Sequence, residues 1–150
     1  MESNRLSRDT GWATSQENVE VLRRSFGKKV DALDDQALDR VLEVFDPDAE
    51  FREDPKFPEA GVYRGHAAIR AYAKRFSGEF DAFSWEAEEM LDAGHDRVLL
   101  LLRVRGRGKG SGAEVDIQAG WLFTLSEASV VRVDAYLDRR EALEAAELSA

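Results

Sequence analysis

The segment from Phe51 to Tyr72 constrains the fold of this chain more than any other part of the sequence. It reads FREDPKFPEAGVYRGHAAIRAY. Its two prolines force extended or turn geometry on the residues before them, and Gly61 and Gly65 bracket a further turn before a helix can start. This order predicts a strand end, two turns and a helix start in close proximity. We therefore expect Asp54 and several aromatic residues to lie at the mouth of the cavity that the fold encloses.

Helices are predicted before and after this segment. Apolar residues recur every three or four positions over residues 19–33 and again over residues 38–45, which is the spacing of one helix face. Asp34 or Asp35 can cap the second helix, and Pro47 is expected to end it. A third helix is predicted over residues 66–77, with Gly78 as its stop.

The hydrophobic period changes to two from about residue 81 onwards, which indicates strands. Further strands are predicted over residues 97–105, 114–125 and 130–137, and their short connections favour antiparallel pairing. Helices followed by strands are typical of the α+β class. We expect a cone-shaped barrel, in which three N-terminal helices pack in a strongly curved, mostly antiparallel sheet. The open mouth of such a cone is a natural small-molecule site.

Composition excludes several classes of function. The 150-residue chain has a net charge of −9 and no cysteine. The acidic balance does not suit nucleic acid, where Lys and Arg must neutralise phosphates, and there is no basic amphipathic helix for a membrane surface. Disulfides and cysteine chemistry are excluded. Residues 14–146 are predicted to form one domain after a loose tail of residues 1–13, and the cytoplasm is the expected compartment.

Several motifs resemble the SnoaL-like group of the nuclear transport factor 2-like superfamily. They are Leu42 to Phe51 (LEVFDPDAEF), Asp54-Pro55, Gly61 to Gly65 with Ala68-Ile69-Arg70, and the closing Val130 to Asp138. The resemblance covers roughly residues 15 to 140. It implies the cone-shaped α+β barrel and, often, a dimer through the outer face of the sheet. Relatives include ketosteroid isomerases, polyketide cyclases, epoxide hydrolases, dehydratases and non-enzymatic binding or assembly domains.

Asp54 is the catalytic candidate that this resemblance implies. Ketosteroid isomerases carry a Glu-Asp-Pro whose aspartate is the general base, and Glu53-Asp54-Pro55 matches it. A carboxylate half-shielded from water can move protons near neutral pH. The alternative is that Asp54 caps a turn before Pro55. The tyrosine and second acid of those isomerases correspond to Phe26 and Trp121 here, so steroid isomerisation by their mechanism is not expected.

Two further charged residues are candidates for polar contacts. Related epoxide hydrolases use an Asp-Arg-Asp set to position a water molecule. Arg103 and Asp116 can pair across the hairpin centred on Gly110, and Asp54 completes the set only if all three face inward. The alternative is a cross-strand ion pair on the solvent side of the sheet.

Aromatic residues are the candidates for an apolar ligand site. Trp121 and Phe123 share one face of their strand, Trp85 contributes from the first long strand, and Tyr63 lies in the turn after Asp54. An aromatic wall suits an apolar, cyclic ligand; the alternative is plain core packing. The two histidines, His66 and His95, do not have metal-ligand spacing, so we expect neither a metal nor an organic cofactor.

The run from Val98 to Leu102 is apolar on both faces of its strand. One face can fill the cone, and the other needs a cover. A homodimer through the sheet is the preferred explanation, and a C-terminal helix is the alternative. The function expected from all these features is a small-molecule pocket protein, acting as a cofactor-independent isomerase, cyclase or hydrolase. A non-catalytic ligand carrier or dimerisation module, or an assembly domain, is the competing hypothesis.

Overall fold

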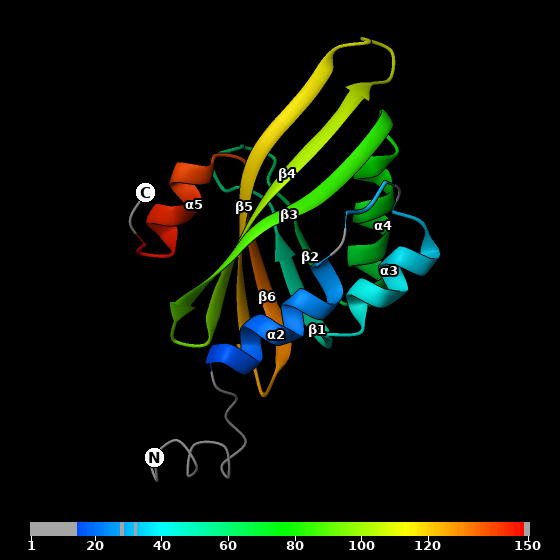
Figure 1. The fold of residues 1–150 in the computed structure, drawn as a ribbon. Coiled ribbons are helices and arrows are strands. Elements are labelled where there is room, and N and C mark those ends of the chain that lie inside the picture. Colours follow the sequence, from blue (N-terminus) through cyan, green and yellow to red (C-terminus); the bar gives the residue numbers. More distant parts are fainter. Residues whose placement is uncertain (1–14, 28, 32, 149–150) are drawn as a thin grey trace, which may run out of the picture.

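One curved sheet of six strands organises the structure (Figure 1). This computed structural model describes residues 15–27, 29–31 and 33–148, so the predicted tail of residues 1–13 lies outside the described part. The strands are β1 (Phe45–Arg52), β2 (Val62–Arg64), β3 (Phe80–Gly94), β4 (Arg97–Gly108), β5 (Glu114–Ser126) and β6 (Ser129–Tyr136). The helices are α2 (Ser15–Phe26), α3 (Asp35–Leu42), α4 (His66–Ser77) and α5 (Arg139–Ala145).

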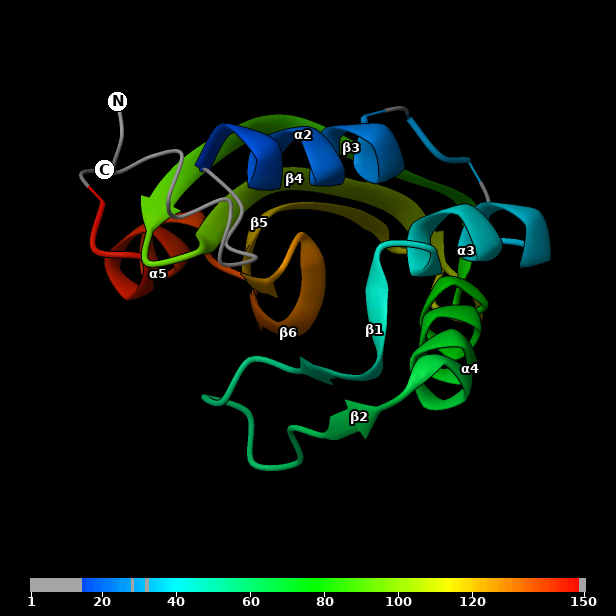
Figure 2. The same cartoon turned by 90° about the horizontal axis from the view of Figure 1, so that it is seen from below.

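The sheet has the strand order β2-β1-β6-β5-β4-β3. β1 and β6 run parallel, and every other neighbouring pair is antiparallel. The long strands curve into an arch (Figure 2). Buried residues of α2, α3 and α4 join the core on one face of this arch, whereas α5 packs on the other face. The predicted cone-shaped α+β barrel with three N-terminal helices is thereby confirmed.

The first helix is shorter than its hydrophobic pattern predicts. α2 ends at Phe26, and the next residue, Gly27, is a poor helix former. Val30 then leaves the helical path and forms an isolated antiparallel bridge with Trp85, with both backbone hydrogen bonds at 2.8 Å. The apolar side chain of Val30 still reaches the core. Its place in the periodic pattern therefore reflects burial rather than helical structure.

Pro47 does not end the second helix, contrary to the prediction. α3 ends at Leu42, and Pro47 lies inside β1, which begins at Phe45. The register of β1 against β6 shifts between Phe45 and Glu50. A proline is tolerated in such an irregular stretch because its missing amide hydrogen removes no regular ladder bond. At the other end of α3 the prediction holds, since Asp34 is the N-cap and accepts from the Ala37 amide at 2.9 Å.

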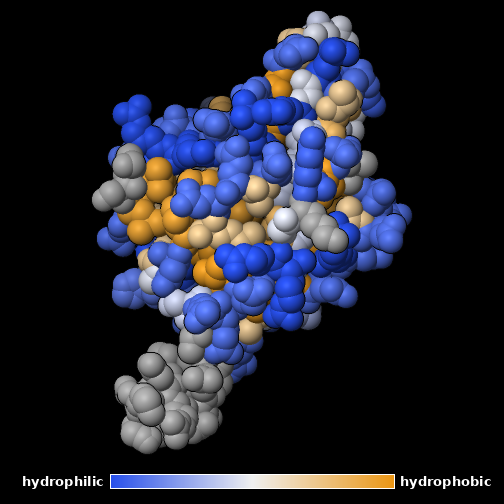
Figure 3. All heavy atoms as spheres, in the orientation of Figure 1, coloured by the Kyte–Doolittle hydropathy of each residue, from blue (hydrophilic) through white to orange (hydrophobic). Residues whose placement is uncertain are grey.

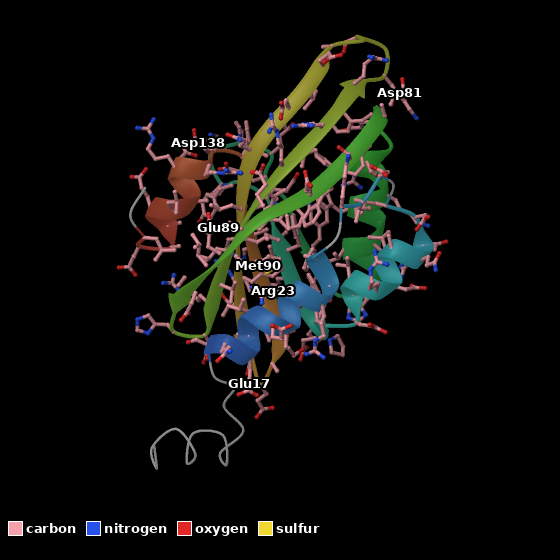
Figure 4. The ribbon with its side chains drawn as sticks, viewed as in Figure 1. Glu17, Arg23, Asp81, Glu89, Met90 and Asp138 are labelled. Carbon is pink, nitrogen blue, oxygen red and sulfur yellow. The ribbon has the colours of Figure 1, made fainter. Side chains whose placement is uncertain are left out.

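The outer face of the Val98–Leu102 run is covered by α5. Leu99 and Leu101 form a second buried cluster with Ala142 of α5, and Asp138 caps this helix by accepting from the Glu141 amide (Figure 4). The C-terminal helix, rather than a second subunit, therefore explains why this strand is apolar on both faces. None of the described helices is long and apolar enough to cross a lipid bilayer.

Candidate functional site

A cavity of about 470 Å³ lies between the helices α2, α3 and α4 and the inner face of the sheet. Its walls are mainly apolar side chains. The inward residues Leu102 and Val104 of β4 and Ile117 and Ala119 of β5 form its floor. The volume is in the range of small-molecule sites, which are typically apolar with a few polar groups. The cavity is therefore large enough for a compact organic molecule.

Two tryptophans from different strands meet in the wall of this cavity. Trp85 of β3 and Trp121 of β5 both line it, and their ring centroids are 5.6 Å apart. Phe26 of α2 packs against Trp85 at 5.4 Å, and Phe51 of β1 meets Trp121 edge-on at 5.3 Å. Such tilted and edge-on contacts are the favoured geometries for aromatic pairs. The structure thus brings together the two tryptophans that the sequence proposes as ligand contacts.

Phe123 and Tyr63 lie next to the cavity without lining it. Phe123 is fully buried and packs against Phe26, with ring centroids 5.3 Å apart. Tyr63 of β2 stacks on Tyr72 of α4 with ring centroids 4.4 Å apart. Tyr72 lines the cavity, so Tyr63 supports its wall from behind. Phe123 and Tyr63 therefore contact the cavity wall only indirectly, each through a neighbouring ring.

Asp54 lines the cavity and is itself buried, with 4% of its surface exposed. One carboxylate oxygen accepts from the Lys56 amide and the other from the Leu137 amide, each at 3.1 Å. The Lys56 ammonium lies 3.9 Å from the second oxygen. The bond to Lys56 is the local turn expected of an Asp before proline. The bond to Leu137 is long-range, so Asp54 also joins the end of β1 to the segment after β6.

Glu53 and Tyr72 add polar groups to the cavity wall that the sequence analysis did not identify. Glu53 accepts from the Gly61 amide at 2.8 Å and from the Tyr63 hydroxyl at 3.3 Å. Burial, together with the negative charge of Glu53, raises the pKa of the Tyr72 phenol well above its usual range. Tyr72 is therefore a neutral hydrogen-bond donor at pH 7. The sequence showed Tyr72 only as one apolar position of a helix face.

Tyr72 provides a testable dependence of stability on pH. Its pKa is higher in the folded than in the unfolded chain, where the reference value is 10.0. Its contribution is therefore fully present below pH 10 and lost as the pH rises further. We expect the unfolding free energy to fall between pH 10 and pH 11.5, and to fall less in Tyr72→Phe. Urea titrations at pH 7, 10 and 11.5 measure this. An equal fall in both proteins would contradict the assignment. The fall would then come from other groups, such as Tyr63 and Tyr136, whose pKa values are also raised.

Arg103 and Asp116 pair with each other away from the cavity. The Arg103 guanidinium donates two hydrogen bonds of 2.7 Å to the two carboxylate oxygens of Asp116. Arg103 lies between the cavity-lining Leu102 and Val104, and Asp116 precedes the cavity-lining Ile117. Successive side chains of a strand point to opposite faces. Arg103 and Asp116 therefore lie on the outer face, where the structure matches the alternative of a solvent-side ion pair. An Asp-Arg-Asp set with Asp54 is not assembled.

The architecture places this chain in the nuclear transport factor 2-like class of α+β barrels. The SnoaL-like domain family matches residues 28–133. The chain belongs to this SnoaL-like domain family. No curated protein gives a significant match.

Solved structures support the same fold. An NTF2-like protein from Burkholderia xenovorans LB400 is 27% identical with a TM-score of 0.64, covering 89% of this chain and 97% of that one. A candidate SnoaL-like polyketide cyclase from Jannaschia sp. CCS1 is 20% identical with a TM-score of 0.65, covering 87% and 91%. TerC, co-crystallised with polyporic acid, is 18% identical with a TM-score of 0.64, covering 87% and 98%.

Proposed function

We propose that this protein binds a small, apolar, cyclic molecule in the cavity between its helices and sheet, and that Asp54 acts there as a general base. This proposal rests on the cavity of about 470 Å³, which has a buried carboxylate among aromatic walls. The co-crystallisation of TerC with polyporic acid supports small-molecule binding by a related fold. Trp85 and Trp121 shape the apolar part of the site. The reaction class is a cofactor-independent isomerisation, cyclisation or hydrolysis.

Asp54 retains the capacity to accept a proton despite its two backbone bonds. Each carboxylate oxygen has two lone pairs, and the Lys56 and Leu137 amides use one on each oxygen. A substrate proton delivered from the cavity can use a remaining lone pair. Tyr72 lies in the same wall, where its one hydroxyl proton is engaged by Glu53.

A non-catalytic ligand carrier is the second candidate, and one observation favours it. Both Asp54 oxygens already serve the backbone, so the carboxylate has a structural role that requires no chemistry. In addition, Phe26 and Trp121 correspond to the two residues with which ketosteroid isomerases stabilise an enolate. A carrier needs the cavity and the aromatic walls but no proton transfer.

Binding and proton exchange with 2-tetralone separate these candidates. This neutral bicyclic ketone has acidic protons next to its carbonyl, and its deuterium exchange in D₂O can be followed by NMR. We expect it to bind and to exchange faster with the wild-type protein. Asp54→Asn should slow the protein-dependent exchange by roughly 100-fold or more. Binding without accelerated exchange would support the carrier and remove Asp54 as a base.

Two controls make this experiment specific. Asp34→Asn makes the same chemical change at a helix cap whose side chain does not line the cavity, and should leave exchange unchanged. Ala119→Phe places a ring into the cavity floor and should abolish binding, whereas Val62→Phe on the exposed edge strand should not. Binding that survives Ala119→Phe would show that the ligand lies elsewhere.

We also propose that the protein forms a homodimer, in the cytoplasm. An uncovered sheet face does not support this dimer, because α5 covers that face. A smaller surface supports the proposal instead: partly buried apolar residues gather between α5 and the edge strand β3 (Figure 3), among them Leu91, Ala93, Leu143 and Leu148. Apolar surface of this kind is typical of contact with another protein.

A further inference from the structure

The charged groups that line the cavity are all of one sign. Among the described lining residues, the carboxylate side chains are Glu53, Asp54, Glu59 and Glu79. No Lys, Arg or His of the described residues lines the cavity. An anionic ligand would meet four carboxylates, of which Asp54 has a nearby cation, the Lys56 ammonium at 3.9 Å. Repulsion between like charges grows stronger where water is excluded.

Three of these carboxylates come from a single connection. Glu53, Asp54 and Glu59 belong to the link between β1 and β2, which also supplies Phe57 to the cavity lining. Phe57 is 44% exposed, so this link forms part of the entrance. The Lys56 ammonium lies 5.7 Å from the centroid of the Phe57 ring and uses one of its faces, which leaves the other face for a ligand. The entrance therefore combines negative charge with an aromatic face that attracts cations.

Two cations border this entrance, and each already has partners. The Lys56 ammonium bonds Glu141 of α5 at 3.1 Å and lies 3.9 Å from Asp54. The Arg75 guanidinium donates to the Tyr63 hydroxyl at 3.1 Å. Neither side chain lines the cavity. Glu59, which is exposed, has no ion-pair partner within the part of the chain that the structure describes.

We infer that the natural ligand is an amphipathic amine, whose apolar ring system enters the cavity while its ammonium group stays at the entrance formed by Glu53, Asp54, Phe57 and Glu59. An ammonium buried among the tryptophans would lose its hydration. At the entrance it keeps water on one side and meets carboxylates on the other. The net charge of −9 attracts a cation from solution as well. This inference rests on the proposed binding function and specifies its ligand class.

Three probes with a common ring system test the inference at pH 7. They share the tetralin skeleton and carry an amine, a hydroxyl or a carboxylate at position 2. The amine and the alcohol are matched in size and differ mainly in charge, whereas the carboxylate is larger. Calorimetry should show the amine binding roughly 5- to 10-fold tighter than the alcohol, the range given by one exposed ion pair with a cation–π contact. The carboxylate should bind most weakly. The advantage of the amine should shrink between 20 and 500 mM NaCl, because salt screens exposed charges.

A matched pair of variants locates the ammonium group. Glu59→Gln should reduce the preference for the amine over the alcohol by about 3-fold. Glu144→Gln makes the same change on the exposed side of α5, away from the cavity, and should leave the preference unchanged. Within the described part of the chain, neither side chain makes a hydrogen bond or an ion pair, so both variants should fold.

The outcomes distinguish this inference from the proposed function. Equal binding of amine and alcohol, or tightest binding of the carboxylate, would overturn the amine inference and leave an apolar pocket protein. An amine preference that Glu59→Gln and Glu144→Gln reduce equally would also overturn it, since the effect would then come from overall charge. If none of the three probes binds, the proposed function itself fails, and the inference fails with it.

Discussion

Gly120→Ala should destabilise the protein by about 3 kcal/mol, the upper part of the range for overpacked cores. Gly120 lies in β5 directly beneath α5. A Cβ atom at this position would be 2.3 Å from the Cβ of Ala142, with Leu99 and Leu101 methyl carbons at 3.5 Å. Two carbon atoms cannot approach so closely, so α5 must shift away from the sheet. Leu99 and Leu101, now almost fully buried, would become accessible to water.

A double variant tests this cause directly. Ala142→Gly removes the atom that the new methyl group would meet, at a cost of about 1 kcal/mol for a glycine in a helix. If the contact is responsible, Gly120→Ala combined with Ala142→Gly should be more stable than the sum of the two single losses predicts. Urea denaturation of the four proteins gives this coupling. Strictly additive losses would show that Gly120 matters for another reason, and a neutral Gly120→Ala would show that α5 is loosely held.

Asp54→Ala should also cost about 3 kcal/mol of unfolding free energy. The substitution leaves the amides of Lys56 and Leu137 without their acceptor, and each unsatisfied buried amide costs about 1–3 kcal/mol. Lys56 and Leu137 are both exposed residues, so water can partly replace the lost acceptor at either amide. The bond to Leu137 differs in that it joins segments 83 residues apart, so its loss also loosens the junction between the end of β1 and the segment after β6. Chemical denaturation measures the total.

Asp34→Ala provides the comparison for a purely local acceptor. It removes a single helix-cap bond to Ala37 and should cost about 1 kcal/mol. If Asp54→Ala costs no more than Asp34→Ala, the bond to Leu137 contributes little, and the case for Asp54 as a free catalytic base becomes stronger. A loss near 3 kcal/mol would mean that catalytic tests of Asp54 must first confirm that each variant is folded.

Asp54 has a structural role and a proposed catalytic role, and Asp54→Asn affects both. In Asp54→Asn one oxygen is replaced by an NH₂ group, which is a donor. This donor would face either the Lys56 or the Leu137 amide, which is also a donor. The substitution therefore removes a charge and disturbs the junction at the same time. The Asp34→Asn control in the exchange experiment accounts for only the first effect, so the denaturation series is needed beside it.

Local signals in the sequence were sufficient for most of the fold. Asp34 predicted the start of α3 because its side chain satisfies an amide three residues away. The alternation around Trp85 and the long apolar strands predicted β3 to β6, because burial on a sheet repeats every two residues. Failures came where tertiary contacts overrode local rules. Val30 fits a helical spacing but pairs with Trp85 as a bridge, and Pro47 lies within a strand at a shift in register.

For the candidate site, too, some features follow from the sequence and others only from the tertiary structure. By itself the sequence determined the class of fold, the aromatic character of the pocket and the turn at Asp54, because each depends on residues close together in the chain. Only the tertiary structure decided that Asp54 reaches Leu137, since this requires the parallel pairing of β1 with β6, whose carboxyl ends then meet. It also decided that Arg103 and Asp116 face outward and that α5 covers Leu99 and Leu101. These facts depend on strand register and on contacts between distant segments, which local periodicity does not encode.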